Sequence, residues 1–489
     1  MSTTGPGPGA TKSTKRAPLG PRGRLVALLV GALVVAVFAN ALIDEPSANP
    51  DAAPAVVVVG ARLPAADAVS SAWYCAAGTA AGPNAEDLVL ANLGVDAAIA
   101  TITVSAYDGN ATTTATKQVR VEPSTTHRIP VATIAAVAQP GIVVDTVGGR
   151  MVVEHVVRGN DDFALTPCAT RTSDRWTFAS GTTAKGATDT ISLFNPTGDD
   201  VIVDVSMFTL QEGRHGASQP QAAQGVDVPP GSRVDLPLHE LAPRNDVIAT
   251  QIVARSGRFV AEQVVMRDAS SGPAGLAASL GAPAAGPTWS LAFGFASAAV
   301  SRQVLVFNPA SRPVELTVRT LLDGDTQLAP FTTELQEEAV SVVDLSRIPA
   351  DAQYALAMTS TGPVVVASDL GFMVQDGPQG IAAEPGTPIP ARVWAFGLAR
   401  IADAGGGSLS VENSGSGAAT VRVTAVRDGG RKRVGAPVAI KAGSSASIDL
   451  AGVPADAAII VTASEPVVVE RLTNQGKGVS LSPGVSAAN

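Results

Sequence analysis

Apolar residues recur along the chain in short alternating runs that are separated by turn residues. In residues 188–208, one alternating run precedes an Asn-Pro turn, and Val201, Val203 and Val205 then fall on one face of a second run. Runs with a period of two on both sides of a turn are typical of two half-buried β-strands. No long amphipathic helical pattern occurs after residue 45. The chain is therefore predicted to be built from strands.

This pattern occurs four times, with one Trp in each copy and an Asn 19 positions after it. Apolar residues occupy the same positions before and after each Asn, and a turn Gly follows at nearly the same offset. Agreement at so many positions indicates an internal repeat. The matched pairs are Trp73 and Asn92, Trp176 and Asn195, Trp289 and Asn308, and Trp394 and Asn413.

Each repeat contains about seven short apolar runs joined by Gly, Pro and Asp turns, which is typical of a two-sheet antiparallel sandwich. We therefore predict an all-β fold with four tandem immunoglobulin-like β-sandwich repeats, each with its Trp in the core. The expected boundaries are 56–172, 173–284, 285–391 and 392–489. A β-propeller is the rival, but its blades have about 40–50 residues, roughly half the repeat length here. Units that follow one another in a row, with or without paired contacts between them, are expected instead.

The N-terminal segments have a different composition. Residues 1–24 are rich in Gly, Pro, Ser, Thr, Lys and Arg and are expected to be a disordered cytoplasmic tail. Residues 25–43 carry no charge and are about long enough to span a membrane as a signal anchor. Basic residues before this run and acidic ones after it predict a cytoplasmic N-terminus and an extracytoplasmic bulk. A cleaved signal peptide is the alternative, and residues 44–55 are expected to be a linker.

The charge and the cysteine content of the chain indicate which ligands are unsuited to it and whether it forms a disulfide. The formal net charge is −9, and the first 24 residues carry five Lys and Arg and no acidic residue, so the remainder of the chain is about −14. The remaining, acidic part of the chain argues against nucleic acid as a ligand. Cys75 and Cys168 are the only cysteines. An even pair in an exported chain predicts a disulfide, here between the first and last strands of the first repeat.

Three glutamates, Glu154, Glu262 and Glu470, occupy one repeat position on strands that are otherwise apolar. A catalytic carboxylate is one interpretation, but catalytic groups rarely recur in every unit of an array. We expect these carboxylates to hold a neighbouring backbone or an arginine instead. The four histidines lack ligand spacing and the glycine-rich turns lack a phosphate-loop pattern. No catalytic, metal or cofactor site is therefore predicted.

Several segments resemble a repeat with the pattern W-Y-x-A-x-G-T … L-x-N-P … P-V-V-x-E-R. They are residues 73–79, 176–182, 193–196, 230–233 and 466–471. The layout of one anchor and four repeats resembles an actinobacterial membrane-anchored surface protein family of unknown function. This resemblance implies a β-sandwich surface module and no activity. The chain departs from the pattern at Ala77 and Ser180, and at Ala367 in the third repeat.

These features predict a non-enzymatic scaffold of the bacterial cell envelope, held in the cytoplasmic membrane by its N-terminal helix and contacting envelope proteins. A cell-wall polysaccharide-binding protein is the alternative, for which exposed aromatic rings would be needed. The few candidates are Tyr74, Tyr107, Phe208 and Tyr354. An enzyme would instead require His127, His155 and Glu154 to meet in one cleft.

Overall fold

The computed structural model describes residues 61–65, 67–210, 216–324 and 327–487. Residues 57–489 form one compact unit. The predicted tail and anchor, and the linker that follows them, lie outside the described residues. Within the described part, no helix is both long enough and apolar enough to cross a membrane.

The predicted all-β class is confirmed, because most of the described residues lie in strands and these pair almost entirely as antiparallel sheets. Helical structure within the described ranges is limited to four single turns. These are α2 (Leu238–Leu241), η1 (Val131–Thr133), η2 (Gln221–Ala223) and η3 (Ala269–Ser271).

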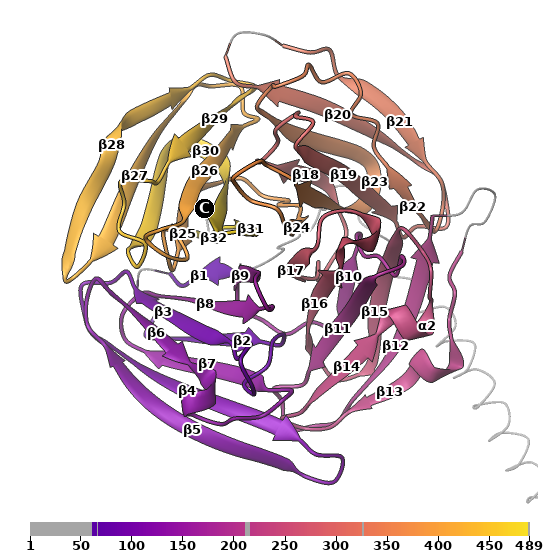
Figure 1. Ribbon diagram of the computed structural model, residues 1–489, viewed down its shortest axis with the longest axis vertical. Helices are drawn as coiled ribbons and strands as arrows, with labels where there is room; N and C mark the ends of the chain where they lie inside the picture. Colours follow the sequence, from indigo (N-terminus) through magenta and orange to yellow (C-terminus); the bar gives the residue numbers. More distant parts are fainter. Residues whose placement is uncertain (1–60, 66, 211–215, 325–326, 488–489) are drawn as a thin grey trace, which may run out of the picture. The chain divides into compact units, whose positions relative to one another are not determined.

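Repeat 1 contains two four-stranded sheets, ordered β2-β7-β4-β5 and β6-β3-β8-β9. The first lies on the outside in Figure 1 and the second reaches the centre with β9. The strands are β2 (Ser70–Cys75), β3 (Asp87–Asn92), β4 (Ala98–Tyr107), β5 (Thr112–Val121), β6 (Thr125–Pro130), β7 (Gly141–Val147), β8 (Met151–Arg158) and β9 (Phe163–Pro167).

Repeat 2 has the same two sheets, ordered β10-β15-β12-β13 and β14-β11-β16-β17. Its strands are β10 (Arg175–Phe178), β11 (Ala187–Phe194), β12 (Val201–Thr209), β13 (Gln224–Val228), β14 (Arg233–Pro237), β15 (Ile248–Ser256), β16 (Val260–Arg267) and β17 (Gly275–Leu280). Eight strands are therefore present where seven were expected. The eighth is the innermost strand, which the sequence did not reveal.

Repeat 3 merges the sixth and seventh strands into one continuous strand, β23, which joins both of its sheets. β23 pairs with β18 and β20 in one half and with β19 and β24 in the other. The strands are β18 (Gly286–Leu291), β19 (Val300–Asn308), β20 (Val314–Leu322), β21 (Phe331–Leu335), β22 (Ala339–Val342), β23 (Tyr354–Phe372) and β24 (Ile381–Pro385).

Repeat 4 has an equivalent continuous strand, β30, and ends in an additional strand, β32, that pairs with its first strand. A short strand near the start of the described chain, β1, lies parallel to β32, with Arg62 opposite Ser486. The strands are β25 (Ala391–Phe396), β26 (Gly406–Asn413), β27 (Ala419–Arg427), β28 (Gly430–Ile440), β29 (Ser444–Asp449), β30 (Ala458–Gln475), β31 (Gly478–Pro483), β32 (Val485–Ala487) and β1 (Arg62–Leu63).

The four repeats follow one another around a common centre, so that repeat 4 also meets repeat 1 (Figure 1). At the centre, β9, β17, β24 and β31 pack against their neighbours from the adjoining repeats. This closed arrangement differs from the expected row of units. It also places β1, which the expected boundary at residue 56 assigns to repeat 1, on the sheet of repeat 4.

Each repeat has its own apolar core, and each core contains the Trp of that repeat. The cores also reach across the boundaries between repeats. Phe208 of repeat 2 packs in the core of repeat 3, with its ring centroid 4.5 Å from that of Phe307. Apolar contacts of this kind stabilise the packing of one repeat against the next, because they remove apolar surface of both repeats from water.

Candidate functional site

The Asn at each repeat position is fully buried and fastens a turn to the adjacent strand. In repeat 2, the Asn195 side-chain amide donates to the carbonyl of Asp199 at 2.7 Å and to that of Val228 at 2.9 Å. Its oxygen accepts the backbone N–H of Thr197. Asn92, Asn308 and Asn413 make equivalent bonds. These residues therefore satisfy buried backbone groups at the turn between the second and third strands.

The Trp positions are structural in the same way. All four indoles are at most 2% exposed. The indole nitrogens of Trp176, Trp289 and Trp394 donate to the backbone carbonyls of Phe259, Val364 and Val467 respectively, at 2.8 to 2.9 Å. That of Trp73 donates to the Ser71 hydroxyl. Each ring thus fills a core while its one polar atom is paired.

The predicted disulfide is confirmed. Cys75, at the end of β2, is bonded to Cys168, which follows β9. Both residues are buried, and the bond joins the outer and inner sheets of repeat 1 across 93 residues of chain.

The glutamates at the shared repeat position reach across to the preceding repeat. The Glu262 carboxylate of repeat 2 accepts the backbone N–H of Ala77 in repeat 1 at 2.6 Å. The Glu470 carboxylate of repeat 4 accepts that of Phe293 in repeat 3 at 2.7 Å. Ala77 and Phe293 each lie four residues after the Trp of their repeat. The same hydrogen bond, from a backbone N–H of one repeat to the glutamate of the next, therefore joins repeats 1 and 2 and repeats 3 and 4.

Glu154 extends this pattern to the boundary that closes the ring. Its carboxylate oxygens each lie 3.1 Å from a terminal nitrogen of Arg471 in repeat 4. Both side chains are at most 1% exposed. The guanidinium also donates to the Leu398 carbonyl and the Ser482 hydroxyl. The pair couples residues 317 positions apart in the chain.

His155 forms a second buried charged cluster, between repeats 1 and 2. Its Nδ1 lies 3.0 Å from a Glu86 oxygen and its Nε2 lies 3.3 Å from a Glu262 oxygen. Burial lowers the pKa of His155, but the charges and hydrogen bonds of Glu262 and Glu86 outweigh it and raise that pKa to about 10. Burial raises the pKa of Glu86. The imidazolium therefore bridges two carboxylates and is enclosed with them.

Three carboxyl groups are buried between repeats 3 and 4: Glu384, Glu412 and Glu470. Burial, and then the nearby Glu470, raise the pKa of Glu384 well above its usual value, although Arg302 lies 3.3 Å away. Burial raises the pKa of Glu412 to about 7. Burial disfavours the charged form of a carboxyl group, so Glu384 and Glu412 keep their protons to a higher pH than exposed glutamates do.

The cluster around His155 differs from the combination of His127, His155 and Glu154 that the sequence analysis considered for an enzyme. His155 meets Glu86 and Glu262 rather than Glu154 and His127, and the cluster is fully enclosed. In the described ranges, no group of three or more His, Cys, Asp or Glu side chains has the arrangement of a metal site. Glu86, His155 and Glu262 are thus enclosed at the boundary between repeats 1 and 2.

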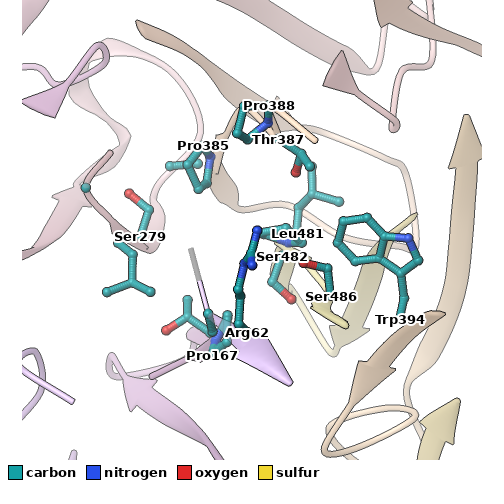
Figure 2. Close-up of a pocket in the computed structure, with 18 of the residues that line it drawn as sticks. Arg62, Pro167, Ser279, Pro385, Thr387, Pro388, Trp394, Leu481, Ser482 and Ser486 are labelled. Carbon is teal, nitrogen blue, oxygen red and sulfur yellow. The ribbon is translucent and has the colours of Figure 1, made fainter. Parts of the chain in front are cut away.

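A small cavity of about 40 Å³ lies at one end of the central axis and is lined by all four repeats. Figure 2 shows the Arg62 side chain reaching into the middle of this axial pocket. Apolar residues such as Leu280, Ile389 and Leu481 form part of the wall. The prolines and hydroxyl side chains of the wall include Thr166, Pro167, Ser279, Pro385, Thr387, Pro388, Ser482 and Ser486, with the Trp394 ring to one side.

The opposite end of the axis opens into a wider hollow of about 830 Å³. Asp162 lies at its base and accepts backbone N–H groups from three repeats, those of Phe163, Leu276 and Val479. Burial raises the pKa of Asp162 to about 6, against the opposing effect of these hydrogen bonds. This carboxylate therefore ties the central strands of repeats 1, 2 and 4 together.

A groove of about 400 Å³ lies between repeats 3 and 4. Its repeat 3 wall carries the rings of Phe293, Phe295, Tyr354 and Phe372, and its repeat 4 wall carries Ser408, Ser410, Ser445 and Ser447. Of the aromatic residues considered from the sequence, Phe208 and Tyr354 are buried, and Tyr74 and Tyr107 are half-buried on repeat 1. They do not form an exposed pair on one face.

The residues that close the ring could not be assigned from the sequence. Arg471 was part of the P-V-V-x-E-R pattern, which gave no indication of its partner. Glu86, Asp162 and Glu384 belong to no recurring motif that the sequence analysis identified. Arg62 likewise belongs to no recurring motif.

Comparisons with known proteins identify a family but no activity. None of the curated proteins compared matches the chain. A crystal structure of Thermotoga maritima 1070 is similar over 21% of this chain and 93% of that one, at 14% identity and a TM-score of 0.19. A Streptomyces avermitilis α-L-rhamnosidase complexed with L-rhamnose is similar over 70% of this chain and 46% of that one, at 9% identity and a TM-score of 0.15.

A tetra-tandem repeat from the extending region of a large adhesion protein is similar over 86% of this chain and all of that one, at 14% identity and a TM-score of 0.09. Similarities at these TM-scores carry no argument about fold or function. The sequence profile of a family of unknown function, DUF5719, matches residues 163–436, more than half of the chain. The protein therefore belongs to the DUF5719 family.

Proposed function

We propose that the protein is a non-enzymatic scaffold of the bacterial cell envelope, which presents its ring outside the cytoplasmic membrane for contact with envelope proteins. One observation carries this proposal: the charged groups at the shared repeat position, Glu154, Glu262 and Glu470, all hold one repeat to another. These three carboxylates are of the kind that a catalytic site would use, but here they bind groups of a neighbouring repeat. A rigid closed array with four outer sheets is suited to binding other macromolecules.

The proposal includes finer statements about the fold and origin. Two antiparallel sheets around a Trp-containing core support an immunoglobulin-like sandwich for each repeat. The uncharged run at residues 25–43 supports a membrane anchor with a cytoplasmic N-terminus. The Cys75–Cys168 disulfide supports an oxidising, extracytoplasmic location for the ring. The W-Y-x-A-x-G-T pattern supports an actinobacterial membrane-anchored family.

Crosslinking in intact cells followed by pull-down of the full chain tests this function. The recovered material is analysed for both proteins and glycans. The matched control replaces residues 25–43 with a cleavable signal peptide, so that the same ring is exported without an anchor. Recovery of a defined envelope protein with the anchored chain only is the expected result. Recovery of no envelope protein, or of the same material with both chains, contradicts an anchored scaffold.

Polysaccharide binding is the second candidate, and the groove between repeats 3 and 4 favours it. A sugar ring has an apolar face and hydroxyl edges, which match a wall of Phe and Tyr rings opposite a wall of serines. Phe295 is the partly exposed ring of that wall. If the groove binds wall glycan, Phe295→Ala should weaken binding to purified wall polysaccharide in affinity electrophoresis. Val95→Ala, which alters an exposed apolar residue of repeat 1, is the control.

A further inference from the structure

The start of the described chain places one cation on the central axis. β1 lies parallel to β32, and Leu63 turns into the apolar core of repeat 1, where it is 4% exposed. Successive side chains of a strand point to opposite sides. Arg62 therefore points away from that core and into the axial pocket, as Figure 2 shows. Its backbone N–H is held by the Thr170 hydroxyl at 3.1 Å.

The Arg62 guanidinium has no counter-charge in the described part of the chain. No ion pair to Arg62 is formed by any described carboxylate, and its Nε is buried without a hydrogen-bond partner. Burial, and then the positive charge of Arg171, lower the pKa of Arg62. Arginine nevertheless stays charged in proteins. A partly buried charge without a partner is costly, and an anion that enters the pocket relieves that cost.

The pocket walls and size restrict what that anion can be. One water molecule needs about 10–15 Å³ of such space, so a cavity of about 40 Å³ has room for a few water molecules. A small group such as a carboxylate therefore fits in it. The flat guanidinium also matches a carboxylate in two parallel hydrogen bonds. Ser279, Thr387 and Ser486 line the pocket with hydroxyl groups that can donate to the same oxygens.

We propose that the axial pocket is a carboxylate-binding site in which the Arg62 guanidinium holds the carboxylate and hydroxyl groups from the other repeats surround it. The site exists only in the closed ring, because its wall comes from all four repeats and its cation comes from the strand that completes repeat 4. The carboxylate belongs either to a free small acid or to the end of a larger chain such as a peptide. Both sources present the same chemical group to Arg62.

The test is a binding titration of the full chain with three probes: acetate, the dipeptide Ac-Ala-Ala with a free carboxylate, and the same dipeptide as its C-terminal amide. Binding is followed by saturation-transfer NMR of the probe methyl groups. Arg62→Gln removes the charge, and Arg62→Lys keeps the charge but loses the two-pronged geometry. Arg422→Gln, at an exposed arginine of β27 outside the pocket, is the matched control.

Carboxylate-bearing probes are expected to bind the wild type and the Arg422→Gln variant equally. Arg62→Gln should weaken that binding at least tenfold, with a smaller loss for Arg62→Lys, and the amide should not bind. Binding of acetate alone identifies a free small acid, and binding of both carboxylates includes a chain terminus; either result supports the site. Equal binding of the acid and amide, unchanged binding by Arg62→Gln, or no binding of any probe overturns it.

Discussion

Glu154→Gln should destabilise the protein strongly, because it leaves the Arg471 guanidinium buried without a counter-charge. Both Glu154 oxygens lie 3.1 Å from guanidinium nitrogens, and both side chains are at most 1% exposed. Removing one member of a buried ion pair costs about 3–5 kcal/mol. The free energy of unfolding, measured in urea from the fluorescence of the four buried Trp residues, should fall by that amount.

The double variant Glu154→Met/Arg471→Met separates the ion pair from the packing around it. Apolar replacements of similar volume remove both desolvated charges, which is often neutral or stabilising. Arg471 also donates to Leu398 and Ser482, and each lost bond costs about 1 kcal/mol. The double variant should therefore lie within about 2 kcal/mol of the wild type and be more stable than Glu154→Gln.

An exposed ion pair provides the matched control. Arg255 and Asp204 of repeat 2 lie 2.6 Å apart, but their side chains are 57% and 30% exposed. Asp204→Asn should cost less than about 1 kcal/mol, because water screens such pairs. If Glu154→Gln costs no more than Asp204→Asn, repeats 1 and 4 are not packed together in solution and the reasoning fails.

Three further predictions concern other buried groups. Asn195→Ala should cost about 2–3 kcal/mol in urea unfolding, because the carbonyls of Asp199 and Val228 lose their donor; a cost equal to that of exposed Asn110→Ala would contradict this. Cys75→Ser/Cys168→Ser should cost about 4 kcal/mol, since the disulfide closes a loop of about 90 residues, and reducing agent should then have no further effect. The folded protein holds a proton on Glu412 between its usual pKa of 4.5 and about 7, so the free energy of unfolding falls as pH rises through that window; Glu412→Gln should remove this part of the slope, and an unchanged slope would refute it.

Patterns local to one repeat could be predicted from the sequence. The Trp-to-Asn spacing and the alternating runs depend on short stretches of chain, and the structure places the four Trp and four Asn at equivalent buried positions. The Cys75–Cys168 disulfide was predicted from a single pair of cysteines in a chain that was expected to be exported. The alternating runs could be predicted because side chains point to opposite faces along a strand, so buried and exposed positions alternate in the sequence.

The features that join the repeats could not be predicted. Each innermost strand, such as β9, is short and buried on both faces, so it lacks the alternation that marks a half-buried strand. β1 is only two residues long, and its pairing with β32 spans nearly the whole chain. The Glu154–Arg471 contact likewise joins distant positions. Ring closure depends on how whole repeats pack against one another. A pattern within a short stretch of sequence does not contain that information.

The most direct test of the closed ring is the distance between spin labels on repeats 1 and 4, measured by pulsed electron paramagnetic resonance. Glu122→Cys and Lys432→Cys carry the labels, since both positions are exposed and both native cysteines are in the disulfide. The Gly429 backbone N–H lies 3.1 Å from the Ser124 carbonyl oxygen, so the labelled Cα atoms lie within about 25 Å. A narrow distribution near or below that distance is predicted. Four units in a row would instead give a separation on the order of 100 Å, and that result would contradict the account.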